Sequence, residues 1–138
     1  MIRYMLDEGA FPITRAYPTD AGGDIRARED KVVPAHGSAI FRTGVHVQVP
    51  QGCAGIIASK SGLNVRNNLT CTGVVDVGYT GEVVVKLYNN GANDYRMERG
   101  DKIAQLLILP CCLERFEQVD GIEGGERGDG GFGSTGKK

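Results

Sequence analysis

The sequence contains no tryptophan and only four phenylalanines among its 138 residues, so aliphatic side chains must supply most of its core. It also lacks an excess of charge, because the formal net charge is −1. Such a chain has no general positive field for binding nucleic acid or an anionic membrane. No apolar run approaches membrane-spanning length, and none near the amino end is typical of a signal peptide. We therefore expect an intracellular, cytoplasmic protein that binds neither nucleic acid nor membrane.

Cysteine is scarce and poorly spaced for holding a metal. The four cysteines form no Cys-x-x-Cys pair, and Cys111 and Cys112 are adjacent, which suits neither one disulfide nor one shared metal. We expect all four to be reduced thiols, buried or half-buried in the fold.

Glycine is the residue that this chain has in abundance. Its 21 glycines, with 41% hydrophobic residues, favour one globular, turn-rich, all-β domain. Short β-prone segments alternate with turn signals throughout. The patterns predict one short helix at residues 63–67. They also predict strands within residues 1–6, 20–27, 38–49, 53–58, 73–75, 82–89, 103–109 and 113–119.

Several polar or small residues occupy informative positions in these strands. His46 alternates with valines and is expected on the polar, solvated face, whereas His36 is expected in a turn. Gly55, inside an apolar strand, indicates a bulge or a close backbone approach. Gln105 is the one polar residue in a long apolar run, so it is either a paired core amide or a site residue.

Residues 72–89 are the most informative stretch of the chain. Two β-prone runs flank the sequence Asp76-Val77-Gly78-Tyr79-Thr80-Gly81, which contains two glycines and predicts a turn. The pattern indicates a hairpin that presents one carboxylate and one aromatic ring at its tip. A carboxylate in a tight turn is often only a turn former, so this stretch alone leaves both interpretations open.

A second candidate site follows the strand at residues 53–58. Ser59, Lys60, Ser61 and Gly62 precede the predicted helix, and free backbone N–H groups beside a lysine favour anion binding. A serine that merely caps the helix explains this segment equally well.

The segment from residue 121 onward changes in character, so we divide the chain into a β domain at residues 1–120 and a glycine-rich tail at 121–138. Composition favours a flexible tail. Yet the tail also carries Arg127, Phe132, Ser134 and Thr135, and these residue types can bind phosphate and stack on a base. A disordered solubilising tail is the alternative.

Taken together, these segments resemble the homotrimeric dUTP pyrophosphatases, the dUTPases, along nearly the whole chain. Five ordered motifs carry the resemblance: Ala21-Gly22-Gly23-Asp24-Ile25, Ser59-Lys60-Ser61-Gly62-Leu63, the stretch 73–89, Gly100-Asp101-Lys102-Ile103-Ala104-Gln105-Leu106, and the tail from 127 to 136. The resemblance implies a jelly-roll subunit with one short helix and a flexible C-terminal arm. It also implies a homotrimer with three shared active sites.

The same resemblance implies Mg²⁺-dependent hydrolysis of dUTP to dUMP and pyrophosphate, which keeps uracil out of DNA and supplies dUMP for dTMP synthesis. Asp76 matches the general base that activates water for attack on the α-phosphorus. Tyr79 matches the ring under the deoxyribose, and Asp24 an indirect support for the metal. Further substrate contacts are implied for Lys60, Ser61, Gly62, Thr70, Gly73, Val83, Gln105, Arg127, Phe132, Gly133, Ser134 and Thr135.

Three positions depart from the family's usual pattern. Lys60 and Lys102 stand where arginine is common, and Gly78 replaces a frequent second aspartate. Lysine keeps the charge but loses the bidentate fork of arginine.

Two other functions remain as alternatives. A dCTP deaminase, or a bifunctional deaminase-hydrolase, on the same fold needs a catalytic glutamate where Lys86 stands. A non-enzymatic nucleotide-binding regulator would not need Asp76.

Overall fold

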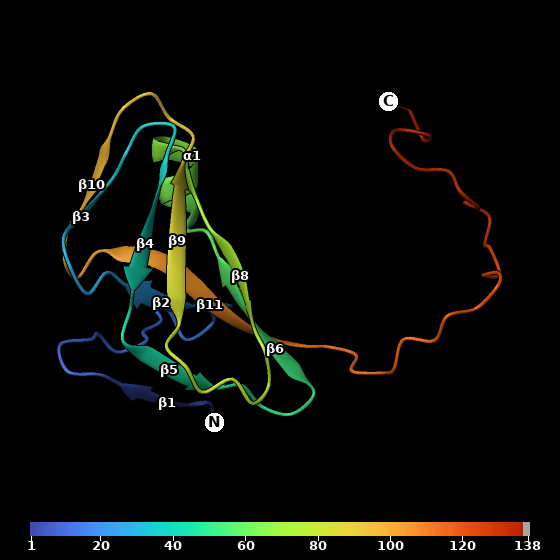
Figure 1. Ribbon diagram of the computed structural model, residues 1–138, viewed down its shortest axis with the longest axis horizontal. Coiled ribbons are helices and arrows are strands. Elements are labelled where there is room, and N and C mark those ends of the chain that lie inside the picture. Colours follow the sequence, from blue (N-terminus) through green and yellow to red (C-terminus); the bar gives the residue numbers. More distant parts are fainter. Residues whose placement is uncertain (137–138) are drawn as a thin grey trace.

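The computed structural model describes residues 1–136, and within them eleven strands and one helix lie between Arg3 and Pro110 (Figure 1). The expected all-β architecture with a single short helix is therefore confirmed. The elements are β1 (Arg3–Leu6), β2 (Gly23–Arg26), β3 (Lys31–Val33), β4 (Ser38–Arg42), β5 (Val45–Gln48), β6 (Cys53–Ala58), α1 (Ser61–Asn67), β7 (Leu69–Thr70), β8 (Thr72–Val75), β9 (Val84–Asn89), β10 (Tyr95–Met97) and β11 (Lys102–Pro110).

Two sheets and two strand pairs form the body. The larger sheet has the order β2-β11-β6-β8, and the smaller has the order β4-β9-β7. β1 pairs with β5, and β10 pairs with β3, so strands from distant parts of the chain lie side by side. All of these pairings are antiparallel.

The core lies between the sheets and is almost entirely aliphatic, as the shortage of aromatic residues predicts. Along β9 and the residue before it, Val83, Val85 and Leu87 are at most 2% exposed, whereas the residues between them face outward. This period of two is the pattern that the sequence predicts for a half-buried strand. Phe41 is the one fully buried phenylalanine among the described residues.

The prediction of a hairpin around Asp76 is wrong, because β8 and β9 belong to different sheets. β8 pairs with β6, and β9 pairs with β4 and β7. The intervening loop crosses from one sheet to the other and docks on β5, where the Val83 N–H donates to the Val45 carbonyl at 2.7 Å. A local turn signal fixes the reversal of the chain but not the partner of each strand.

The single strand expected across residues 38–49 is interrupted. Thr43 and Gly44 separate β4 from β5, and Gly44 has φ +67°, which favours glycine. The buried Thr43 hydroxyl donates to the Val83 carbonyl at 2.6 Å and accepts from the Val45 N–H at 3.2 Å. The break therefore redirects the chain from the smaller sheet to its pairing with β1.

The strand expected at residues 113–119 does not form. After the Cys111 N–H donates to the Gly52 carbonyl at 2.9 Å, the chain leaves the body and runs as an extended, exposed arm (Figure 1). Leu113, Phe116 and Val119 are all exposed. Their alternation with polar residues imitates a strand, but no neighbouring strand in residues 1–136 pairs with them.

The four cysteines are free thiols, as expected, although Cys112 is exposed rather than buried. Burial raises the pKa of the Cys71 thiol. Across residues 1–136, no helix combines the length and hydropathy needed to cross a membrane.

Candidate active site

Asp76 follows the last residue of β8 and begins the loop that crosses between the sheets. Its carbonyl accepts a turn hydrogen bond from the Tyr79 N–H at 3.2 Å, and Gly78 within that turn has φ +85°. The Asp76 side chain is exposed, and no ion pair among residues 1–136 engages it. This carboxylate is therefore accessible to solvent and to a ligand.

Tyr79 is held rigidly although 47% of it is exposed. Its hydroxyl donates to the Glu82 carbonyl at 2.9 Å, and its ring covers Gly81 so closely that a Cβ there would lie 2.5 Å from the ring carbon Cζ. The ring borders an open hollow of about 630 Å³, whose other walls come from β1, β5 and the turn itself. Tyr79 thus offers a fixed flat face to a ligand.

Glu82 anchors the far end of this loop, a role that nothing in its sequence context indicates. Its carboxylate accepts from the Gly44 N–H at 2.7 Å and pairs with Arg42 at 3.0 Å. The neighbouring Val83 is buried, and both its backbone groups bond within the chain. The Val83 N–H is therefore already engaged, and its carbonyl keeps one acceptor site for a further donor.

Gly73 and Thr70 lie close to the loop in sequence but in different strands. Gly73 is in β8, the edge strand of the larger sheet, which pairs on one side only among the described strands. Thr70 ends β7, and its hydroxyl accepts a long 3.4 Å bond from Asn90. An edge strand offers backbone donors and acceptors to a flat ligand such as a base.

Asp24 lies in β2 with a side chain only 6% exposed. One carboxylate oxygen contacts the Lys60 ammonium at 2.5 Å, and the other contacts the Lys102 ammonium at 2.7 Å. Burial alone would raise the pKa of this carboxyl, but the hydrogen bonds and charges of Lys102 and Lys60 outweigh burial and lower it. The sequence did not reveal that Lys102 belongs to this cluster.

Gln105 and Ser59 fix the segment that leads into α1. Gln105 stands opposite Asp24 in the sheet, and its amide donates to the Ser59 carbonyl at 3.0 Å. The Ser59 hydroxyl bonds to the backbone of Cys71 and does not cap the helix, whose N-cap is Lys60 without a side-chain hydrogen bond. The serine-cap interpretation is therefore wrong. Ser61 and Gly62, in the first turn of α1, are exposed.

These two groups of residues lie at opposite ends of the same strands. In the register of β6 with β8, Ala58 stands opposite Thr72 and Gly55 opposite Val75. Residues that follow Ala58 therefore lie about 15 Å along the strands from residues that follow Val75. Figure 1 shows the same separation, with α1 at one end of the body and the loop after β8 at the other.

The predicted site residues of the arm are distant from both groups. All of them are exposed: Arg127, Phe132, Gly133, Ser134 and Thr135. The hydrogen bonds of this segment are turns within itself, for example from the Ser134 N–H to the Gly131 carbonyl at 3.1 Å. Within the described residues, one chain does not assemble the predicted site.

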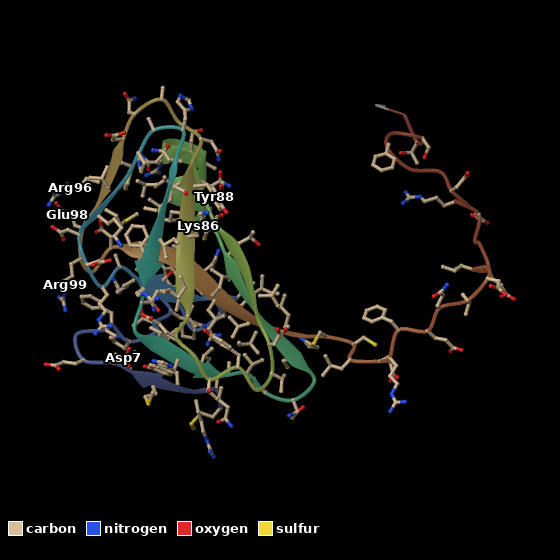
Figure 2. The ribbon with its side chains drawn as sticks, viewed as in Figure 1. Asp7, Lys86, Tyr88, Arg96, Glu98 and Arg99 are labelled. Carbon is tan, nitrogen blue, oxygen red and sulfur yellow. The ribbon has the colours of Figure 1, made fainter. Side chains whose placement is uncertain are left out.

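Lys86 lies on the outward face of β9, where its ammonium is 5.0 Å from the ring centre of Tyr88 (Figure 2). The position at which a deaminase of this fold needs a glutamate therefore holds an ammonium group and no carboxylate.

The dUTPase family model matches residues 10–136 of this chain. The deoxyuridine 5′-triphosphate nucleotidohydrolase of Kluyveromyces lactis is 45% identical over 127 residues, which is 90% of this chain and 85% of that protein. The corresponding protein of Debaryomyces hansenii is 39% identical over 137 residues, which is 97% of this chain and 86% of its own.

Solved structures agree with these relatives. The dUTPase of Staphylococcus bacteriophage 80alpha with dUPNHPP has a TM-score of 0.88 and 31% identity, covering 99% of this chain and 98% of that one. A mutant dUTPase from phage phi11 of S. aureus, in which a structural Mg(II) ion is coordinated, has a TM-score of 0.82 and 28% identity, covering 90% and 99%. The likeness confirms the jelly-roll-like subunit that the sequence predicts.

Proposed function

This chain belongs to the dUTPase family and hydrolyses dUTP to dUMP and pyrophosphate, and on that premise we propose that Asp76 is the general base of the reaction. The observation that carries the assignment is the contrast between the two aspartates. The Asp24 carboxylate is buried between two lysines, whereas the Asp76 carboxylate is exposed and outside every ion pair of residues 1–136. Only Asp76 is free to orient water and take its proton.

The fixed ring of Tyr79 supports a role in sugar selection. Its hydroxyl bond to Glu82 and its contact with Gly81 leave the ring little freedom to move. We propose that the deoxyribose lies on this ring, where a 2′-hydroxyl would lose water without gaining a partner. The base would then read the free edge of β8, near Gly73 and Thr70.

The opposite end of the larger sheet suits the triphosphate. Ser61 and Gly62 expose the first turn of α1 beside Lys60 and Gln105. We propose that these groups bind phosphate oxygens and that Asp24 holds Lys60 in place until substrate arrives. A lysine can pass from a carboxylate to a phosphate by rotating about its flexible stem.

Magnesium fits this site as a companion of the triphosphate. Within residues 1–136 no cluster of three or more His, Cys, Asp or Glu residues could hold a metal ion, and both oxygens of Asp24 contact lysines. Mg²⁺ commonly keeps several waters and binds through one or two carboxylates together with substrate phosphates. We infer that Mg²⁺ arrives with dUTP, is approached by Asp24 through water, and when bound draws charge from the triphosphate.

The separation of the two groups supports a homotrimer with shared sites. The base at one end of β8 and the phosphate-binding turn at the other end lie about 15 Å apart in one chain, too far to hold one α-phosphorus between them. A neighbouring chain can supply the missing half, as the head-to-tail interfaces of a cyclic trimer allow.

The arm completes this arrangement. It leaves the body after Cys111 and makes no strand, so it can reach a neighbouring subunit. We propose that Arg127 clamps the terminal phosphate, that Phe132 covers the uracil, and that Gly133, Ser134 and Thr135 donate to phosphate oxygens. On this proposal residues 121–138 form a lid that orders on binding.

The place of action follows from the reaction. Removing dUTP keeps uracil out of DNA and supplies dUMP for dTMP synthesis, so we place the enzyme in the cytoplasm with the nucleotide pool.

A panel of dUTP, UTP, dCTP and dTTP with pyrophosphate and ammonia detection, with and without Mg²⁺, tests the function. Pyrophosphate release from dUTP alone, and only with Mg²⁺, is expected. Ammonia release from dCTP would show a deaminase instead.

A further inference from the structure

The surroundings of His46 contradict the expectation that its side chain is simply solvated on the polar face of the strand. It lies in β5, and its side chain is only 20% exposed. The ring nitrogen Nδ1 is 2.9 Å from the carbonyl oxygen of Thr80, in the turn that carries Asp76 and Tyr79. The other nitrogen, Nε2, is 3.2 Å from Oδ1 of Asp7, in the loop after β1 (Figure 2 labels Asp7).

Both partners of this ring are hydrogen-bond acceptors. The Thr80 carbonyl can only accept, and so can the ionised carboxylate of Asp7. A neutral imidazole has one N–H and therefore satisfies only one of them, leaving a bare ring nitrogen facing an oxygen. The imidazolium has two N–H groups and satisfies both. The geometry of the contacts thus specifies the charged ring.

We propose that His46 is a positioning residue of the dUTPase reaction, whose doubly donating imidazolium ties the turn bearing Asp76 and Tyr79 to Asp7 and β5. The inference rests on the proposed roles of Asp76 and Tyr79. The connection is direct, because Thr80 is the residue after Tyr79 and the Asp76 carbonyl accepts from the Tyr79 N–H. With Glu82 anchoring the end of the loop on Gly44 and Arg42, the turn is fixed on both sides.

The charges around the ring favour its protonated form. Asp7 faces it from the loop after β1 and Glu82 from the crossing loop, and each carboxylate has its own arginine, Arg28 on Asp7 at 3.6 Å and Arg42 on Glu82 at 3.0 Å. Other residues with titratable groups line the neighbouring hollow together with His46: Met1, Arg3, Tyr4 and Tyr79.

The sum of these effects raises the pKa of His46 above its usual 6.5. The hydrogen bond to the Thr80 carbonyl contributes most, loss of water around the ring opposes it, and the charges of Asp7 and Glu82 add to it. Because the folded pKa is raised, the two-sided contact is complete at pH values below about 6.5 and is lost as the pH rises through the pKa of the folded protein. The turn should then loosen, and turnover should fall on the alkaline side.

The experiment compares three proteins in which only the histidines differ: wild type, His46→Gln and His36→Gln. Glutamine keeps a donor for one of the two acceptors but does not titrate. The second histidine of the chain, His36, lies in a turn at φ +54° outside the site and serves as the matched control. The first measurement is ¹⁵N NMR of the two imidazole rings between pH 5 and 10. The second is kcat and kcat/KM for dUTP with Mg²⁺ over the same range.

We expect the His46 ring to carry protons on both nitrogens at pH 6 and to titrate with a pKa above 6.5. Wild-type kcat should fall by about three- to tenfold as the pH rises through that titration, because the turn loses one hydrogen bond. The fall should be absent from His46→Gln, whose kcat is lowered at every pH, and should be retained in His36→Gln. Asp7→Asn should move the fall to lower pH, because it removes the neighbouring negative charge.

A His46 ring that titrates at or below pH 6.5, or an alkaline fall that persists unchanged in His46→Gln, would overturn the inference. The NMR result alone decides the matter if the variant does not fold. A wild-type protein that hydrolyses no dUTP at any pH would instead remove the proposed function, while the protonation of the ring could still be read from the same spectra.

Discussion

At the scale of single residues, the site shows how the surroundings give one residue type two different roles. Asp24 and Asp76 carry the same carboxyl group, yet one is buried between two ammonium groups and the other faces water. The first cannot take a proton without losing two ion pairs, whereas the second can. Position in the fold, rather than residue type, therefore separates the proposed support, Asp24, from the proposed base, Asp76.

Replacing the base tests this division. Asp76→Asn keeps the size and the turn but cannot accept a proton from water, so kcat should fall on the order of 10²- to 10⁴-fold. Binding of a non-hydrolysed dUTP analogue, measured by calorimetry, should change little. Turnover close to that of wild type would remove Asp76 from the role of base.

The support is tested by its pH dependence. The pKa of Asp24 is lowered in the folded state, so its contribution to stability is present above its usual value of 3.8 and is lost as the pH falls through the folded value. Asp24→Asn should therefore lower the urea midpoint at pH 7, and the difference from wild type should shrink below pH 3.8. A difference that grows on acidification would contradict the two-lysine contact as its source.

At the scale of elements, periodicity predicted most strands, but it did not predict their partners. The alternation in residues 83–87 was predicted correctly because burial of one face of a strand shows in the local sequence. The single helix was also predicted correctly, although none of its residues is buried. The hairpin at Asp76 was wrong because sheet membership depends on contacts with residues far away in the chain. The strand predicted at residues 113–119 was wrong for the same reason, since an alternating segment becomes a strand only where another strand pairs with it.

Close packing against neighbouring strands on both sides restricts the residue type at Gly55 in β6. The register passes through it without a bulge, so close approach is the correct interpretation of this glycine. A Cβ at Gly55 would lie 3.0 Å from Cβ of Val75 and 3.3 Å from Cδ1 of Leu106. Gly55→Ala should lower the free energy of unfolding by about 1–3 kcal/mol, because both neighbours are buried.

The matched control for that change lies on the paired strand. A Cβ at Gly73 would meet Ile57 at an ordinary 3.5 Å, so Gly73→Ala should alter the free energy of unfolding by less than about 0.5 kcal/mol. Urea denaturation of both variants makes the comparison. Equal destabilisation of the two would mean that close packing at Gly55 is not the cause.

At the scale of the whole molecule, the five motifs were recognisable in the sequence, but their distribution in space was not. The two lysines on Asp24 and the contacts of His46 join elements that are far apart in the chain, and no spacing rule links them. The sequence thus predicted candidate site residues, and the fold shows which of them one chain brings together.

Sharing of sites can be tested by mixing two inactive proteins, Asp76→Asn with an intact arm and a chain truncated after Gly125. The experiment assumes that the base and the arm of one site come from different chains. A mixed site is then active when the truncated chain supplies Asp76 and the Asp76→Asn chain supplies the intact arm. Equal co-refolding should then restore about a quarter of wild-type activity, one half times one half. No activity above that of the separate proteins, with mixed trimers verified by mass spectrometry, would exclude shared sites.

The exposed arm has a consequence for how long the enzyme remains active in a cell. Arg115 and Arg127 lie beyond the last backbone hydrogen bond to the body, in exposed chain that a protease can cut without unfolding any strand. On the proposed arrangement, a single cut there would remove the lid and leave the β body folded. Bound substrate would protect the arm from proteolysis by ordering it. Enzyme molecules with bound dUTP would therefore be degraded more slowly than empty ones. The concentration of dUTP would then control how fast the enzyme itself is degraded.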